Sequence, residues 1–249
     1  ASTSNSNLSA SRAPDVLNVL FSGPLAWCDK ANQLHPLDRL DYASERDALV
    51  AVFKEVGRDI SLCFDFATTD SMRTALSFGC RALHFSGHGH PDSLNFEDRR
   101  GGLQVVTADR LKALLQAGSS ELALDFVFVA ACYSKQTGEV FIECGVKHVV
   151  AVKVDAMIQD SAAKAFTRAF YVALLSGKTV QQSFDIAVEA LKASPYVPDA
   201  VLEGEKFILL PEPESEDDKL HEEVIFKGSP VPSWPMLGQC VYGTKSAIG

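Results

Sequence analysis

The sequence predicts an α/β fold for this chain of 249 residues. Segments whose apolar residues recur at helical spacing alternate with short apolar runs along most of the length, which is typical of α/β domains. The run Leu122–Ala131 is almost wholly apolar, as expected for a central strand of a parallel sheet that is covered on both faces. Hydrophobic residues make up 47% of the chain, which is enough for one sizeable core.

The first part of the chain alternates between predicted strands and predicted helices. The strands are Val16–Phe21, Ile60–Phe66 and Arg81–Ser86, and the helices between them are Asp41–Val56 and Asp70–Phe78. Gly57 follows the last apolar residue of the first helix and is the predicted stop signal. Thr69 or Asp70 is the predicted cap of the second helix.

The alternation continues to about residue 210. A hairpin is predicted from Leu94–Phe96 and Leu103–Val106, followed by a helix from its cap Thr107 to about Ala117. The strand Leu122–Ala131 and a polar loop at 132–138 come next. A short helix that ends near Gly145 then leads to the strand His148–Val152. Two helices capped by Asp160 and Thr179 follow, with Gly177 ending the first of them, and Phe207–Leu210 is a final strand.

Composition divides the chain into a folded part and two flanking segments. Residues 1–14 are rich in Ser and Asn and are predicted to be disordered. Residues 15–210 form the predicted domain, and 211–249 are interpreted as an acidic and then Pro- and Gly-rich tail or linker.

Charge, hydropathy and cysteine spacing exclude several classes of protein. The net charge of -9 argues against a nucleic-acid partner. No apolar run reaches the ~20 residues that a membrane-spanning helix needs, and no signal peptide is recognisable. The six cysteines are scattered without a CxxC pair, so neither a disulfide framework nor a zinc site is expected, and a cytoplasmic location is predicted.

Two predicted strands end in residues that can carry out chemistry. One runs into Gly87, His88 and Gly89, and the other into Cys132. If these strands are neighbours in the sheet, an imidazole lies beside a thiol and can act as the base that a cysteine nucleophile needs. Gly89 would let its backbone N–H approach a substrate carbonyl, and together with the Cys132 N–H it could form an oxyanion hole. The alternative is a structural histidine and a small buried cysteine.

Two further motifs are interpreted as coincidental. The segment 88–92 has the H-x-H-x-D pattern of zinc hydrolases, but Ser93 stands where that motif requires another histidine. The segment 176–179 looks like the end of a phosphate-binding loop, but Val172 replaces its first glycine and the segment joins two predicted helices.

From about Arg81 to Leu191 the sequence resembles the CHAT domain family of caspase-like cysteine peptidases, which are relatives of separase, caspases and metacaspases. The matching stretches are ALHFSGHG at 82–89, VTADRL at 106–111, FVFVAACYS at 126–134, GVKHVVAV at 145–152, the pattern D-x-A-A-x-x-F-x-x-x-F-Y at 160–171, and SGKTVQQSF at 176–184. The resemblance implies a caspase-like three-layer α/β/α sandwich with a mostly parallel central sheet. It also implies a dyad of His88 and Cys132, an oxyanion hole from Gly89 and Cys132, and no metal or cofactor.

One departure affects the expected substrate pocket. Metacaspases carry an aspartate two residues before the cysteine, where this chain has Ala130, so their preference for basic residues cannot be copied. Asp155 and Asp160 follow the strand after Cys132 and are candidate pocket residues, although Asp160 is also the predicted helix cap.

Two functions from different classes remain open. The first is a cysteine endopeptidase that acts on protein or peptide substrates. The second is a catalytically silent caspase-like signalling or scaffold module. Because similar sequences continue through a comparable tail into oligomerisation modules of the STAND ATPase kind, the resemblance implies an effector domain of a larger signalling or immune-type protein. The expected regulatory partner is therefore a further domain of the same parent chain, and the isolated domain is predicted to be latent.

Overall fold

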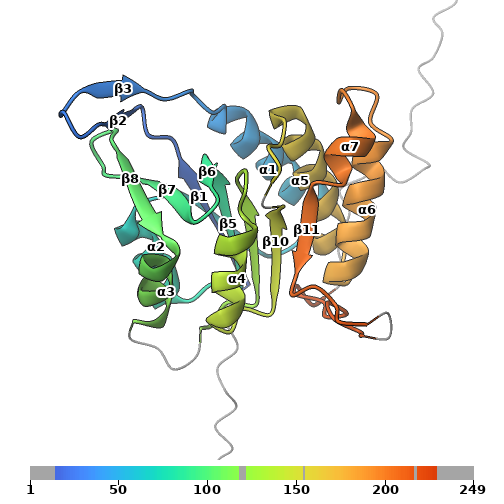
Figure 1. Ribbon diagram of the computed structural model, residues 1–249. Coiled ribbons are helices and arrows are strands. Elements are labelled where there is room, and N and C mark those ends of the chain that lie inside the picture. Colours follow the sequence, from blue (N-terminus) through green and yellow to red (C-terminus); the bar gives the residue numbers. More distant parts are fainter. Residues whose placement is uncertain (1–14, 118–121, 154, 216–217, 229–249) are drawn as a thin grey trace, which may run out of the picture.

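A computed structural model describes residues 15–117, 122–153, 155–215 and 218–228 (Figure 1). The prediction of disorder for residues 1–14 and the last part of the predicted linker lie outside these residues.

A six-stranded sheet forms the centre of the molecule, in the order β11-β10-β9-β5-β1-β4. Its strands are β1 (Val16–Ser22), β4 (Ser61–Phe66), β5 (Ala82–Gly87), β9 (Phe126–Ala130), β10 (His148–Val152) and β11 (Phe207–Leu210). Neighbouring strands are parallel except for the antiparallel edge pair of β10 and β11. The prediction of a mostly parallel sheet is therefore confirmed.

Helices cover both faces of this sheet. One face is packed by α1 (Tyr42–Val56), α5 (Asp160–Leu175) and α6 (Val180–Lys192), and the other by α2 (Thr69–Phe78), α3 (Ala108–Gln116) and α4 (Lys135–Glu143) (Figure 1). Successive residues of β9 alternate between the two cores: Phe126 and Phe128 join the first, whereas Val127 and Val129 join the second. The predicted three-layer architecture is confirmed, and burial on both faces explains why β9 is apolar throughout.

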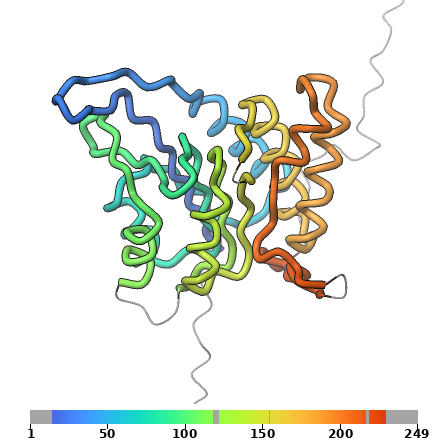
Figure 2. The backbone as a smooth tube through the Cα atoms, viewed as in Figure 1, coloured from blue at the N-terminus to red at the C-terminus, as the bar shows by residue number. Residues whose placement is uncertain are grey.

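Short elements extend this frame. The predicted hairpin is present as β7 (Ser93–Glu97) and β8 (Leu103–Thr107), with β6 (Gly89–His90) pairing beside it. A second hairpin, β2 (Ala26–Cys28) with β3 (Leu34–Pro36), and the helix α7 (Ala200–Gly204) were not predicted. They are too short to show a hydrophobic period. The chain leaves the β2–β3 hairpin and runs along one end of the molecule to α1 (Figure 2).

Several element boundaries differ from the predicted ones, among them those of β9 and α2. β9 begins at Phe126 instead of Leu122, although Leu124 is buried in the second core without being part of a strand. α2 is capped by Thr68, one residue before the predicted candidates, because Thr68 has the extended backbone of a cap and exchanges hydrogen bonds with Ser71.

The polar segment after β9 also differs from the prediction. Residues 132–138 were expected to form a loop, but α4 already begins at Lys135. Only the tight connection at residues 131–134 separates β9 from α4, so Cys132 is held close to the end of its strand.

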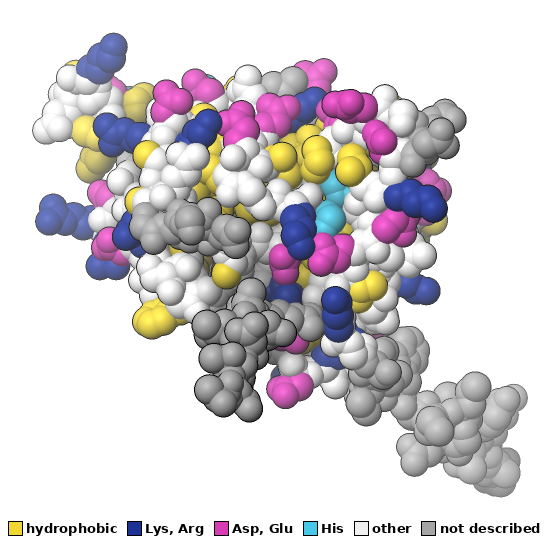
Figure 3. All heavy atoms as spheres, turned by 90° about the horizontal axis from the view of Figure 1, so that it is seen from below, with side chains coloured by type: hydrophobic (Ala, Val, Ile, Leu, Met, Phe, Trp, Pro, Cys, Tyr) yellow, Lys and Arg dark blue, Asp and Glu magenta, His cyan; other side chains and the backbone are white. Residues whose placement is uncertain are grey.

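Residues beyond β11 fold back onto the domain. Ile225 and Phe226 are buried in the core on the α1, α5 and α6 face, and the Arg58 guanidinium donates a hydrogen bond to the Phe226 carbonyl at 2.5 Å. His221 lies 2.8 Å from His148, Nδ1 to Nδ1, at the start of β10. On the face seen from below, basic and acidic side chains are interspersed (Figure 3). Within the described ranges, no helix combines the length and apolarity needed to cross a bilayer.

Candidate active site

His88 and Cys132 follow two strands that are neighbours in the sheet. β5 and β9 are parallel, and Ser86 pairs with Ala130 in their register, so each functional residue comes two positions after a paired one. The carboxyl ends of parallel strands meet at one edge of a sheet, which is where ligands bind in α/β folds. Both side chains line a pocket of about 370 Å³ at this edge.

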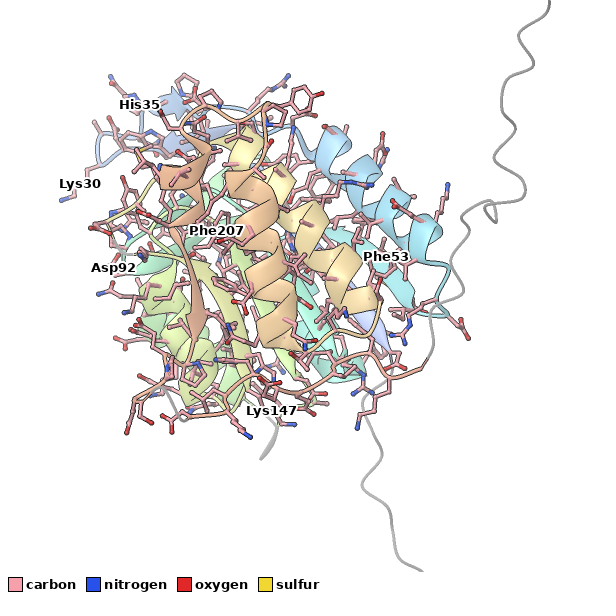
Figure 4. The ribbon with its side chains drawn as sticks, turned by 90° about the vertical axis from the view of Figure 1, so that its right-hand side faces the viewer. Lys30, His35, Phe53, Asp92, Lys147 and Phe207 are labelled. Atoms are coloured by element: carbon pink, nitrogen blue, oxygen red, sulfur yellow. The ribbon has the colours of Figure 1, made fainter. Side chains whose placement is uncertain are left out.

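The loops around this pocket lie at the end of the molecule where the parallel strands β5 and β9 finish. Figure 4 shows His35, in β3, at one end and Lys147, just before β10, at the opposite end. The chain that follows β3 reaches the pocket through Asp38.

The imidazole of His88 is held by a backbone carbonyl. Its Nε2 lies 2.8 Å from the carbonyl oxygen of Asp38. A carbonyl only accepts hydrogen bonds, so Nε2 carries the proton and donates it to Asp38. In the tautomer that carries this N–H, Nδ1 holds the lone pair that a general base requires.

The turn that carries Cys132 is fixed from both sides. Tyr133 has a left-handed backbone with a φ of 57°, and its N–H donates to the Ala156 carbonyl at 3.2 Å. Ser134 is fully buried, and its hydroxyl donates to the Val129 carbonyl at 3.1 Å and accepts from the Val152 N–H at 2.9 Å. These bonds tie the turn to β9 and β10 and restrict the position of the thiol.

The Cys132 sulfur has a donor of its own. The backbone N–H of Ile158 points at Sγ from 3.5 Å. This contact fixes the direction of the Cys132 side chain relative to the segment that precedes α5.

Gly89 lies directly against the Cys132 backbone. A Cβ built on Gly89 would be 1.9 Å from the Cys132 carbonyl oxygen and 3.0 Å from the Cys132 nitrogen. Only glycine fits between these two segments. Among the residues that the structure describes, the Cys132 N–H has no hydrogen-bond acceptor.

A buried polar network closes one side of the pocket. Glu45, on α1, accepts a hydrogen bond from the Ser86 hydroxyl at 2.7 Å and lies 3.1 Å from His84 Nε2. The other ring nitrogen of His84 is 3.1 Å from the hydroxyl of Tyr171. His84 and Tyr171 are fully buried, whereas the Glu45 side chain is 16% exposed and lines the pocket.

Glu45 is held as a carboxylate in this setting. Burial alone would raise its pKa, but the hydrogen bond and charge of His84, the hydroxyl of Ser86 and the nearby charge of Lys164 together lower the pKa below its ordinary value. The pocket therefore presents an anionic oxygen pair beside the cysteine.

Of the two aspartates predicted to belong to the pocket, one lines it. Asp160 is among the lining residues, and Asp155 is an exposed turn residue outside them. Asp160 is the first residue of α5 rather than its cap, because Gln159 occupies the capping position with an extended backbone.

The two motifs interpreted as coincidental have ordinary roles. His90 and Asp92 hydrogen-bond to each other at 2.7 Å on the surface. In the parts of the chain that the structure describes, no three His, Cys, Asp or Glu side chains come together in a way that could hold a metal ion. The segment 176–179 joins α5 to α6, with Gly177 at a φ of 87° and Thr179 capping α6, as predicted.

Three groups of this site were not identified from sequence. The Asp38 carbonyl and the Ile158 N–H act through the backbone, so their side chains gave no signal. Glu45 did give one: it lies four residues before Leu49 and seven before Val52, on the buried stripe of α1. A carboxylate on an apolar stripe indicates a buried polar contact or a site.

Comparisons with known proteins agree with this architecture. A family model described as the CHAT domain matches residues 1–198, and no curated protein matches the chain. The Arg-specific cysteine proteinase gingipain R is similar in structure at 14% identity and a TM-score of 0.50, covering 78% of this chain and 45% of its own. The complex of the Porphyromonas gingivalis RgpB pro- and mature domains is similar at 14% identity and a TM-score of 0.51. The match covers 78% of this chain and 46% of that chain.

Caspase-1 from Spodoptera frugiperda aligns at 10% identity with a TM-score of 0.42, over 80% of this chain and 86% of its own. This chain spans less than half the length of the gingipain chains, and the similarity to them shows a shared fold.

Proposed function

Because the chain belongs to the CHAT domain family, we propose that it is a cysteine endopeptidase in which His88 and Cys132 hydrolyse peptide bonds. The observation that carries the proposal is the position of both side chains in one pocket, at the ends of adjacent strands. The hydrogen bond from His88 to the Asp38 carbonyl supports it, since it occupies Nε2 and leaves Nδ1 for the thiol proton.

In the proposed acylation step, His88 Nδ1 takes the thiol proton of Cys132 and the thiolate attacks the scissile carbonyl carbon. The tetrahedral intermediate collapses with cleavage of the C–N bond, and the imidazolium gives its proton to the leaving amine. A thioester remains on Cys132. His88 then deprotonates a water molecule that attacks this thioester, which releases a carboxylic acid and restores the thiol.

The proposed oxyanion hole consists of the Gly89 and Cys132 N–H groups. The close approach of Gly89 to the Cys132 backbone supports this pairing, because it brings the main chains of the two residues together. The Cys132 N–H, which has no acceptor within the described ranges, is available to an oxyanion. Such donors act on charge that develops only in the transition state.

The proposal is tested with single and double variants of the dyad. Cys132→Ala and His88→Ala are each expected to abolish cleavage of a denatured-protein or peptide-library substrate with the thermal unfolding midpoint unchanged. The double variant is expected to be no worse than either single one, since the pair acts as a unit. A thiol-reactive peptidyl probe should label wild-type Cys132 but not Cys132→Ala.

Cleavage that survives in Cys132→Ala would contradict the mechanism. A folded chain whose Cys132 resists the probe and which cleaves nothing would instead favour the silent scaffold module. Activity is expected to be unaffected by EDTA, and loss on chelation with recovery on adding zinc would point to His88 and His90 as metal ligands.

The proposal extends to the setting of the enzyme. We propose a cytoplasmic effector domain of a signalling or immune-type protein, regulated by another domain of its parent chain. The resemblance of the sequence to modules of larger proteins supports this. Turnover measured with and without the remainder of the parent protein tests it, and equal rates would contradict regulation.

A further inference from the structure

Residues of β5, β9 and α1 line the pocket that contains Cys132. Ser86 and Ala130 are paired across β5 and β9 and both line the pocket. Ala130 contributes an uncharged methyl group to this lining, whereas Glu45 contributes a carboxylate. Glu45 reaches this pocket from a different element, α1.

We propose that Glu45 binds the side chain of the substrate residue on the N-terminal side of the scissile bond and selects arginine or lysine at that position. This inference rests on the proposed peptidase function. It assigns the substrate class to a residue outside the dyad and other than Asp155 and Asp160.

The geometry leaves Glu45 able to bind a substrate cation. A carboxylate offers about four acceptor positions, and Glu45 uses one oxygen toward His84 at 3.1 Å and the other toward Ser86 at 2.7 Å. Each oxygen therefore retains a lone pair. These two contacts also fix the carboxylate, so a guanidinium or ammonium group would meet a preorganised anion.

The charges around the pocket favour a cationic ligand. The lining includes four carboxylates, from Asp38, Asp41, Glu45 and Asp160, against the cations Arg39 and Lys164. Lys164 is already engaged, because its ammonium group lies 3.3 Å from Asp41 and 3.2 Å from the Ser44 hydroxyl. A substrate arginine or lysine would add positive charge to a pocket whose lining carboxylates outnumber its lysine and arginine side chains.

Asp160 is the competing carboxylate. It also lines the pocket, but its side chain is exposed at the start of α5, and no hydrogen bond or ion pair is recorded for it among the described residues. An exposed charge is screened by water and salt, whereas a nearly buried one interacts strongly. Glu45 therefore contributes more to selection than Asp160.

The first experiment uses the unmodified chain and a fluorogenic peptide library that varies only the residue before the cleaved bond. Hydrolysis after Arg or Lys is expected to exceed hydrolysis after Leu, Gln or Asp by about 30-fold or more in kcat/KM, the effect of one desolvated charge pair. Benzamidine, an amidinium that mimics the arginine side chain, is expected to inhibit competitively. Preferred cleavage after uncharged or acidic residues would overturn the inference.

The second experiment compares Glu45→Gln with two carboxylate variants. Glu45→Gln preserves shape and is expected to lose about 30-fold or more in kcat/KM for Arg substrates. Asp47→Asn, on the outer face of the same helix, is the matched control and should leave kcat/KM unchanged. If Asp160→Asn removes the basic preference and Glu45→Gln does not, the assignment to Glu45 is wrong.

A binding measurement separates this inference from the proposed function. Fluorescence of 4-aminobenzamidine reports occupancy of the pocket without turnover, and a weaker affinity for Glu45→Gln than for wild type is expected. A chain that cleaves nothing but binds the probe through Glu45 would refute only the peptidase proposal. A chain that cleaves peptides but binds no amidinium would refute only the role of Glu45. If Glu45→Gln fails to fold, the peptide library and benzamidine inhibition of the wild type still test the preference for basic residues. Asp160→Asn then tests whether Asp160 accounts for that preference.

Discussion

Replacing Gly89 with alanine tests the contact on which the site geometry depends. The added Cβ would lie 1.9 Å from the Cys132 carbonyl oxygen, about 1.4 Å inside the ~3.3 Å of an ordinary C···O contact. The neighbouring atoms are main chain, so no side chain can rotate away to relieve the clash. The two segments must therefore separate by roughly 1 Å or more, a displacement that can reduce the rate of a catalysed step by about 100-fold.

The assay is kcat/KM on a peptide substrate together with the thermal unfolding midpoint. Gly89→Ala is expected to lose about 100-fold in kcat/KM and about 1–3 kcal/mol in the free energy of unfolding, the usual cost of overpacking. Gly204→Ala is the matched control, because its added Cβ meets the flexible Lys192 side chain at 3.0 Å and the Val188 carbonyl oxygen at an ordinary contact distance of 3.6 Å. Near wild-type activity and stability in Gly89→Ala would refute the reasoning.

Three further predictions concern stability. Burial lowers the pKa of His148 and of His221, so the unfolded chain binds more protons than the folded one below a histidine pKa of about 6.5. The thermal unfolding midpoint should therefore fall as pH drops from about 7.5 to 5.5. The fall should be less steep in His221→Asn, because asparagine tolerates the φ of 66° at this position. Phe128→Ala should lower the free energy of unfolding in urea by about 3–5 kcal/mol, since Phe128 is fully buried in an aromatic cluster. A loss under about 1 kcal/mol would contradict its central position. Arg81→Met should lower the free energy of unfolding by about 2 kcal/mol in the same measurement, because it removes the ion pairs of a buried guanidinium with Asp15 and Asp125; no change would show that the pairs contribute nothing.

The site depends on short connections between rigid elements. His88 follows β5 directly, and Cys132 lies two residues after β9 and three before α4. The hydroxyl of Ser134 closes this connection onto β9 and β10. A residue held in this way keeps its orientation when substrate binds, which is what preorganised catalysis requires.

Much of this architecture was predictable because its elements are long and periodic or are bounded by specific residues. The spacing of apolar residues located α1, α5 and α6, and continuous apolar runs located β1, β9 and β10. Gly57 and Thr179 marked helix ends through local backbone rules that need no tertiary information. The positions of His88 and Cys132 at strand ends were visible for the same reason.

Contacts between distant segments were decided by the tertiary structure. Sequence spacing cannot show which strands are neighbours, and the pairing of β5 with β9 is what brings His88 to the pocket of Cys132. The carbonyl of Asp38 reaches His88 across fifty residues of chain, and a carbonyl is the same in every residue type.

Glu45 illustrates the same division between sequence and structure. Its place on the buried stripe of α1 was readable from the sequence, whereas its contacts with His84 and Ser86 follow from how α1 packs on β5. Local sequence determined which residues were available to the site, because helix and strand periodicity depend on near neighbours. Packing of the layers decided which of them meet, because that depends on distances between segments far apart in the chain.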